Sequence, residues 1–151
     1  MTSARSDGIP KQLGHVALRV RDLDGAVAFY SDVLGLSVRR QGRGPAFLGA
    51  REDASHELAL MPLPPDAPGP DPARVGMYHF AWEMATFESL AALHRRLLES
   101  GTKIAGYSEA TDSANVMFFD PEGNEIEAIW EPPADEVARI KAVGAFPRLP
   151  H

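Results

Sequence analysis

The chain has 151 residues and a formal net charge of -6, which argues against a nucleic acid or an anionic membrane surface as its partner. It contains no cysteine, so disulfides, thiolate metal sites and cysteine nucleophiles are excluded, and histidines and carboxylates remain for chemistry. No apolar run approaches the ~20 residues that a membrane-spanning helix needs. We therefore expect a cytoplasmic protein whose partner is a small molecule.

The first part of the chain predicts one strand, one helix and three further strands. Residues 1–12 are polar and are expected to form a disordered N-terminus. A strand is expected at 13–21, followed by a helix that Asp22 or Asp24 caps and Gly35 ends. Turn compositions then separate three short strands, at 36–41, 46–50 and 57–62. Together these elements form an expected first module over residues 13–62.

The second part of the chain repeats this order after a proline-rich linker. Residues 63–74 carry five of the thirteen prolines, so they are interpreted as a linker between two halves. A strand over 75–84, a helix between Thr86 and Gly101, and strands at 102–107, 115–119 and 125–130 then form a second module over residues 75–131. Residues 132–151 are an expected tail with a short helix near 135–143.

The two halves therefore define an α+β fold with two tandem βαβββ modules. A repeat of this size indicates one structural unit used twice. We expect a curved, cup-shaped mixed sheet with helices on the outer face and an inner face that surrounds a ligand.

The repeat places His15 and His79 at equivalent positions of the two first strands. Side chains alternate between the faces of a strand, so each histidine shares its face with a small residue, Ala17 or Ala81. The last strand of each module adds carboxylates among apolar neighbours, Glu57 in the first and Glu125 and Glu127 in the second. A buried carboxylate needs a cation or a metal as its partner. Two histidines and one carboxylate with open positions are typical of non-haem Fe(II) oxygenases.

The same residues could also have purely structural roles. A single histidine in an amphipathic strand is more often a core or rim residue than a ligand. Two histidines at equivalent positions favour ligation. Glu57 is equally compatible with a hydrogen bond at the edge of a sheet.

Between residues 13 and 131 the sequence resembles the vicinal oxygen chelate superfamily of glyoxalases, extradiol dioxygenases, epimerases and antibiotic-resistance proteins. The residues that carry the resemblance are His15-Val16-Ala17, Phe29-Tyr30, Leu34-Gly35-Leu36, Tyr78-His79-Phe80-Ala81 and the stretch from Phe118 to Glu127. The resemblance implies that His15, His79 and Glu127 are metal ligands. It also implies that Glu57 matches a fourth ligand, with a catalytic role, in glyoxalase-type members.

Within that superfamily the chain is most similar to single-module catechol 2,3-dioxygenase-like members, but it departs from them at two positions. The branch has an acid/base histidine before the penultimate strand and a tyrosine within that strand. Those positions fall on Ala110 and Met117 here, and no histidine occurs between His94 and His151. A ring-cleaving reaction would lack its usual proton shuttle.

The resemblance implies a metal-dependent enzyme in which the metal chelates two neighbouring oxygens of a small substrate. The dioxygenase version would use Fe(II). The glyoxalase or epimerase version would be a lyase or isomerase that uses Zn, Ni, Mn or Co and adds Glu57. The alternative from another class is a non-catalytic protein that sequesters an antibiotic or another small molecule, as bleomycin-resistance members do. We also expect a homodimer, because half-sheets expose their edges and Trp82, Trp130 and Phe146 need cover.

Overall fold

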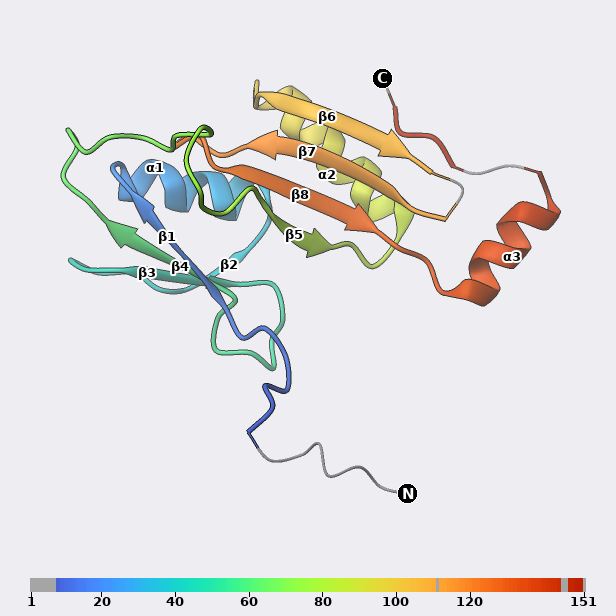
Figure 1. Cartoon of the computed structure of the whole chain (residues 1–151), viewed down its shortest axis with the longest axis horizontal. Helices are drawn as coiled ribbons and strands as arrows, with labels where there is room; N and C mark the ends of the chain where they lie inside the picture. Colours follow the sequence, from blue (N-terminus) through green and yellow to red (C-terminus); the bar gives the residue numbers. More distant parts are fainter. Residues whose placement is uncertain (1–7, 111, 145–146, 151) are drawn as a thin grey trace.

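The computed structural model describes residues 8–110, 112–144 and 147–150, in which the predicted α+β architecture of two modules is confirmed. The strands form two open four-stranded sheets rather than one continuous sheet, with helices α1 and α2 on one side of them (Figure 1). The first module contains β1 (Val16–Val20), α1 (Leu23–Ala28), β2 (Ser37–Arg40), β3 (Ala46–Gly49) and β4 (Leu58–Pro62). The second contains β5 (Phe80–Glu83), α2 (Phe87–Glu99), β6 (Ile104–Glu109), β7 (Ala114–Phe119) and β8 (Glu125–Trp130).

The first module forms a sheet in the order β1-β4-β3-β2, with β1 parallel to β4. Asp22 caps α1 by accepting a hydrogen bond from the amide of Gly25 at 3.0 Å. The helix continues as one π-helical segment, Phe29–Val33, and ends at Gly35, whose φ of 92° suits glycine. Both predicted boundary signals of this helix are therefore confirmed.

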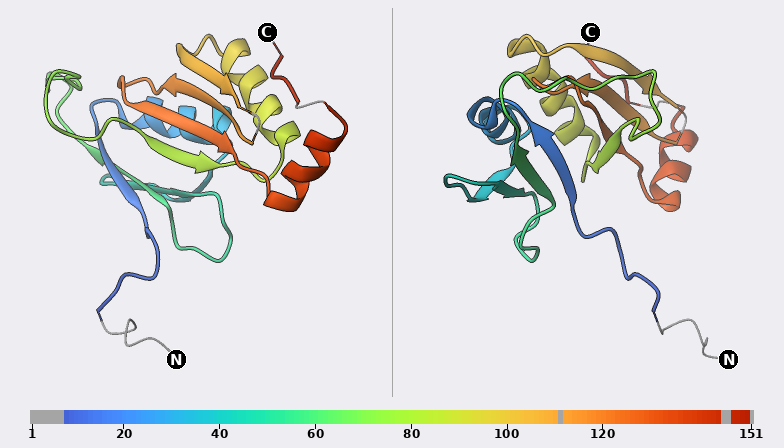
Figure 2. Two further views of the ribbon diagram at one scale, coloured as in Figure 1. Left: turned by 45° about the vertical axis from the view of Figure 1, so that its right-hand side comes forward. Right: turned by 60° about the vertical axis from the view of Figure 1, so that its left-hand side comes forward.

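The second module repeats the topology, with strand order β5-β8-β7-β6. Thr86 and Ser89 form a capping box at the start of α2, and Gly101, with a φ of 69°, follows its end. The predicted strand over 75–84 is too long, because the ladder of β5 with β8 covers only Phe80 to Glu83. The segment before it remains irregular and leads from β4 to β5 (Figures 1 and 2).

The C-terminal part adds helix α3, Ala134–Ala142, close to its predicted position. The expected disorder of residues 1–12 falls largely outside the described residues. Among the helices of the described ranges, none combines the length and the apolar character that crossing a membrane requires.

One hydrophobic core serves both modules. It includes buried residues of both sheets and of both helices, and the rings of Phe29 and Phe118 lie 6.2 Å apart across the module boundary. The Arg96 guanidinium of α2 donates to the carbonyl oxygen of Val33 at 2.9 Å. The modules are therefore packed together through their helical side, while the opposite faces of the sheets stay open.

The turn between β7 and β8 joins the two modules through buried carboxylates. The Asp120 carboxylate accepts hydrogen bonds from the amides of Glu122 and Asn124 and, at 2.7 Å, from the hydroxyl of Tyr30. Burial, the charge of Asp120 and this hydrogen bond raise the pKa of Tyr30 well above its ordinary value, so its hydroxyl stays a donor. The Glu122 carboxylate accepts from the amides of Arg21 and Asp22, both at 3.0 Å, and from Arg21 Nε at 2.8 Å. The turn motif that carried much of the resemblance thus has a structural function.

The variant Glu122→Gln should be less stable than the unchanged protein at pH 7, by about 2–3 kcal/mol, because a buried charge-assisted contact is lost. Burial alone would raise the pKa of Glu122, but the hydrogen bonds from Asp22 and Arg21 outweigh it and hold that pKa below its ordinary value. Its contribution is therefore present above the ordinary pKa of a glutamate and disappears as the pH falls through the depressed pKa.

Urea unfolding of both proteins between pH 7 and pH 3 measures this contribution. The stability difference should be largest at pH 7 and should shrink as the solution becomes acidic. A difference that stays constant over this range would contradict the assignment.

Candidate metal centre

The open face of the second sheet carries the side chains of Asn115, Glu125 and Glu127, and His79 lies beside them. In the register of the sheet, Ala81 lies opposite Glu127, and Glu127 lies opposite Met117. The neighbouring row, Phe80, Ile126 and Phe118, belongs to the core on the other face. The alternation of polar and apolar side chains in the sequence therefore corresponds to the two faces of the sheet.

His79 and Glu127 lie close together on this open face. His79 Nε2 is 3.1 Å from Glu127 Oε2, and their side chains are 27% and 13% exposed. The other carboxylate oxygen, Glu127 Oε1, accepts a hydrogen bond from Asn115 Nδ2 at 2.6 Å. Each oxygen of the Glu127 carboxylate thus has its own neighbour, Asn115 for Oε1 and His79 for Oε2.

The second nitrogen of His79 faces a different carboxylate. Nδ1 is buried and has no hydrogen-bond partner among the described residues, and Glu125 Oε1 lies 4.0 Å from it. That distance is too long for a hydrogen bond. Glu125 nevertheless places a second negative charge beside the imidazole, because it shares the open face with Glu127.

His15 lies just before β1, is exposed and contacts a different histidine. Its ring is 4.7 Å from that of His56, which in turn lies 4.9 Å from the ring of Phe47. Over the residues that the structure describes, no three histidine or carboxylate side chains gather closely enough to hold one ion. The structure thus brings His79 and Glu127 together and leaves His15 apart from them.

Glu57 is held by the backbone of its own module. Its carboxylate accepts hydrogen bonds from the amides of Ala50 at 3.0 Å and Arg51 at 3.2 Å, and Arg51 Nε lies 3.9 Å away. The sequence allowed a structural role for Glu57 through a hydrogen bond at the edge of a sheet, and the amides that follow β3 give it hydrogen bonds of this structural kind.

The donors of the second sheet fit two neighbouring positions of one metal ion. Ligands at right angles around an ion, with bonds of about 2.1 Å, lie about 3 Å apart. The 3.1 Å between His79 Nε2 and Glu127 Oε2 agrees with this spacing, and a hydrogen bond can occupy the same geometry without an ion. An imidazole and a carboxylate suit borderline and hard divalent ions.

A cavity of about 930 Å³ adjoins the second sheet. One side of the cavity is lined by Pro68 to Pro72 of the linker and by Arg74 to Tyr78, which lead to β5. The other side is lined by Phe80, Phe119 and Glu125 of the sheet. Its lining residue Glu125 lies 4.0 Å from His79 Nδ1, whereas neither His79 nor Glu127 lines the cavity itself.

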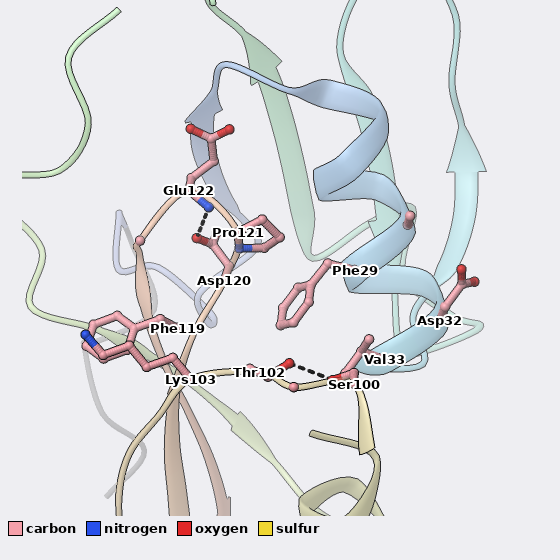
Figure 3. A pocket seen from close by; sticks show the side chains of 13 residues that line it. Phe29, Asp32, Val33, Ser100, Thr102, Lys103, Phe119, Asp120, Pro121 and Glu122 are labelled. Atoms are coloured by element: carbon pink, nitrogen blue, oxygen red, sulfur yellow. Dashed lines mark hydrogen bonds between the residues drawn. The ribbon is translucent and has the colours of Figure 1, made fainter. Parts of the chain in front are cut away.

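A second cavity, of about 740 Å³, lies at the boundary between the modules (Figure 3). It is lined by Phe29 and Val33 from the first module and by the segment around Thr102 and the turn at Asp120 from the second. Neither His79 nor Glu127 lines it, so it is not part of the candidate metal centre.

Asn115 and His56 lie near the predicted ligands although the sequence did not indicate them, whereas Glu125 was expected only as a carboxylate on the same strand as Glu127. Asn115 and Glu125 share the open face with Glu127, and His56 contacts His15. Alternation could have placed Asn115 and Glu125 on that face, since they lie an even number of residues from Met117 and Glu127. Nothing local in the sequence indicates that the His56 ring turns toward His15.

The two positions at which the sequence departs from dioxygenase-like members have different surroundings. Met117 lies directly opposite Glu127 in the sheet, so an apolar side chain occupies the site where that branch has a tyrosine. Ala110 is exposed in the turn between β6 and β7, where its amide donates to the carbonyl of Ser113.

Comparison with known proteins assigns the family. Residues 12–128 match the model of the Glyoxalase/Bleomycin resistance protein/Dioxygenase superfamily, and the chain belongs to this superfamily. It is 31% identical over 134 residues to Catechol-2,3-dioxygenase of Bacillus subtilis, a match that covers 88% of this chain and 45% of that protein. The chain thus spans less than half the length of this relative.

Two further similarities show how varied the relatives are. Glutathione transferase FosA of Serratia marcescens is 27% identical over 120 residues, covering 78% of this chain and 79% of that protein. The crystal structure of Lactoylglutathione lyase from Agrobacterium tumefaciens superposes with a TM-score of 0.63 at 25% identity, covering 80% of this chain and 94% of that one. The family is therefore established, and its members named here have three different activities.

Proposed function

We propose that this protein is a metal-dependent enzyme that binds a small substrate through two neighbouring oxygen atoms, with His15, His79 and Glu127 as metal ligands. The observation that supports it best is the 3.1 Å contact between His79 Nε2 and Glu127 Oε2 on an open sheet face. Fe(II) suits a site of two histidines and one carboxylate. A bound ion would supply Lewis-acid stabilisation of the anion that forms on the substrate.

Residues of the chain would hold the ion, line the space beside it and accept a proton from the substrate. His79 and Glu127 would hold one side of the ion, and residues of the segment before β5 would line the space beside Glu125. The negative charges of Glu125 and Glu127 favour a cation between them and the substrate. Glu125 is also a carboxylate near the pair that can accept a proton from a bound substrate.

A three-ligand site is favoured over the four-ligand site of the glyoxalase or epimerase alternative. The oxygens of Glu57 already accept hydrogen bonds from two backbone amides, so its recruitment as a ligand would require its carboxylate to move or to share those oxygens with the ion. The lyase or isomerase alternative therefore requires such a change at Glu57, which the dioxygenase-like set avoids.

A non-catalytic binding protein is the second candidate, and the position of Met117 favours it. A thioether opposite Glu127 cannot move a proton, so the site could hold a ligand without transforming it. Elemental analysis of protein purified without chelators tests both candidates. About one Fe, Zn, Ni, Mn or Co per site supports the enzyme, whereas a protein without stoichiometric metal supports sequestration.

We expect the protein to be a homodimer, since the open sheet faces and the exposed Val75, Met77 and Tyr78 leave apolar surface without cover. One reason for this prediction was wrong: Trp130 is only 4% exposed and makes an edge-to-face contact with the ring of Phe87 within the chain. Phe146 lies outside the described residues. Light scattering at micromolar concentration should give twice the 16.4 kDa of one chain. A mass near one chain would contradict the prediction.

His15 poses a separate requirement for the three-ligand site. It lies just before β1, and among the described residues it does not gather with His79 and Glu127, so a three-ligand site requires its side chain to move toward the pair or a second copy to supply it. The metal affinity of His15→Ala, compared with that of the unchanged protein, measures its participation directly.

A further inference from the structure

We propose that Asn115 is a positioning residue that holds one oxygen of Glu127 and leaves the other to face His79 and the metal. The proposal rests on the proposed metal site and adds a residue to it. Asn115 lies on β7, across the sheet from β8, and its Nδ2 donates to Glu127 Oε1 at 2.6 Å.

The orientation of the Asn115 amide follows from chemistry. An ionised carboxylate only accepts hydrogen bonds, so the amide end that approaches Glu127 must be the NH2 group. The amide oxygen, Oδ1, is then directed elsewhere. It is buried and has no hydrogen-bond partner among the described residues.

The unpaired oxygen makes a role in packing alone a poor explanation for Asn115. A buried acceptor without a partner costs about 1–3 kcal/mol. A leucine of similar shape would avoid that cost, and its register neighbour Ile129 shows that apolar side chains fit this face. The contact with Glu127 is what an apolar residue could not provide.

The two oxygens of Glu127 consequently have separate partners. Oε1 is engaged by Asn115, and Oε2 lies 3.1 Å from His79 Nε2. A carboxylate held at one oxygen cannot rotate freely, so Oε2 keeps its direction toward the position between it and the imidazole. Neighbours that orient a ligand in this way are worth tenfold to a hundredfold in metal affinity.

Titration with cobalt(II) tests the proposal, because the visible spectrum of this ion reports both binding and coordination. The variant Asn115→Leu, which keeps the shape and removes the donor, should bind cobalt(II) about ten to a hundred times more weakly and with an altered spectrum. Asn115→Gln restores a donor and should recover part of the affinity. Ser108→Ala, at the position paired with Asn115 in the sheet, is the matched control and should bind like the unchanged protein.

A second measurement needs no metal. Nitrogen-15 spectra of the ion-free protein report which ring nitrogen of His79 carries the proton, and the contact with Glu127 Oε2 favours Nε2. Loosening of Glu127 in Asn115→Leu should shift this balance toward Nδ1, whereas the control should not change it.

The outcomes separate this proposal from the proposed function. Unchanged cobalt(II) affinity in Asn115→Leu, or a lowered melting temperature with unchanged affinity, overturns the role of Asn115 alone. An unchanged protein that takes up no ion overturns the proposed metal site, and the proton position on His79 then decides whether Asn115 still orients Glu127.

Discussion

The variant His79→Ala should bind divalent metal at least about a hundredfold more weakly than the unchanged protein, because loss of a ligand exceeds the effect of losing a neighbour that only orients one. The fold should remain intact. His79 lies just before β5 and outside its ladder, and the core that serves both modules does not include it. A catalytic-type ion is held by few ligands and does not drive the folding of a domain of this size.

Isothermal titration at limiting metal measures this effect, and thermal unfolding of the ion-free proteins confirms the fold. Glu83→Ala is the matched control, since Glu83 is an exposed residue of β5 on the same face as His79 and Ala81. Full metal occupancy in His79→Ala would show that the ligand assignment is wrong. A comparable loss in the control would point to a general change in charge.

The protein loaded anaerobically with Fe(II) should bind simple catechols and cleave them slowly or not at all. Proton transfer by a positioned side chain is worth roughly a hundredfold to ten-thousandfold in rate. Met117, directly opposite Glu127, offers no exchangeable proton, and Ala110 offers no side-chain acid or base. Binding and turnover should therefore separate.

The spectrum of the iron protein should change when catechol is added, while the yellow ring-opened product should not accumulate. Ala110→His could recover part of the rate, and Met117→Tyr tests the position that faces Glu127. Met61→Tyr, in the first sheet, provides a control for adding a phenol elsewhere. A turnover of at least ~1 per second by the unchanged protein would mean that another group supplies the proton. Glu125 would then be the first residue to replace.

Sequence alternation predicted most of what lies within one module. His79, Ala81 and Glu127 share a face because side chains alternate along a strand, and the caps at Asp22 and Thr86 act through their own local hydrogen bonds. The end of β5 nearest the linker was placed too early. Met77 and Tyr78 continue the alternating pattern, but a pattern cannot reveal that no neighbouring strand pairs with them.

Contacts of individual side chains were harder to predict. The equivalence of His15 and His79 is a property of the repeat, whereas their neighbours differ: His56 lies beside His15, and Glu127 lies beside His79. The hydrogen-bond partners of Glu57 lie six and seven residues before it, after β3, and the partner of Asn115 lies twelve residues after it, on the neighbouring strand. Pairwise contacts of that kind leave no periodic signal in the sequence. The hydrogen-bond partners of Glu57 and of Asn115 could therefore be identified only from the structure.

The buried turn at Asp120 and Glu122 changes what the linker is needed for. The two modules share one core, and Tyr30 and Arg21 of the first are bonded to the turn of the second. Covalent continuity between the halves therefore contributes little to keeping them together once the protein has folded. The exposed stretch near Arg74 and Val75 could be cut while the halves remain one particle. The contacts at this turn and in the shared core, rather than the connecting segment, are therefore expected to hold the two halves together.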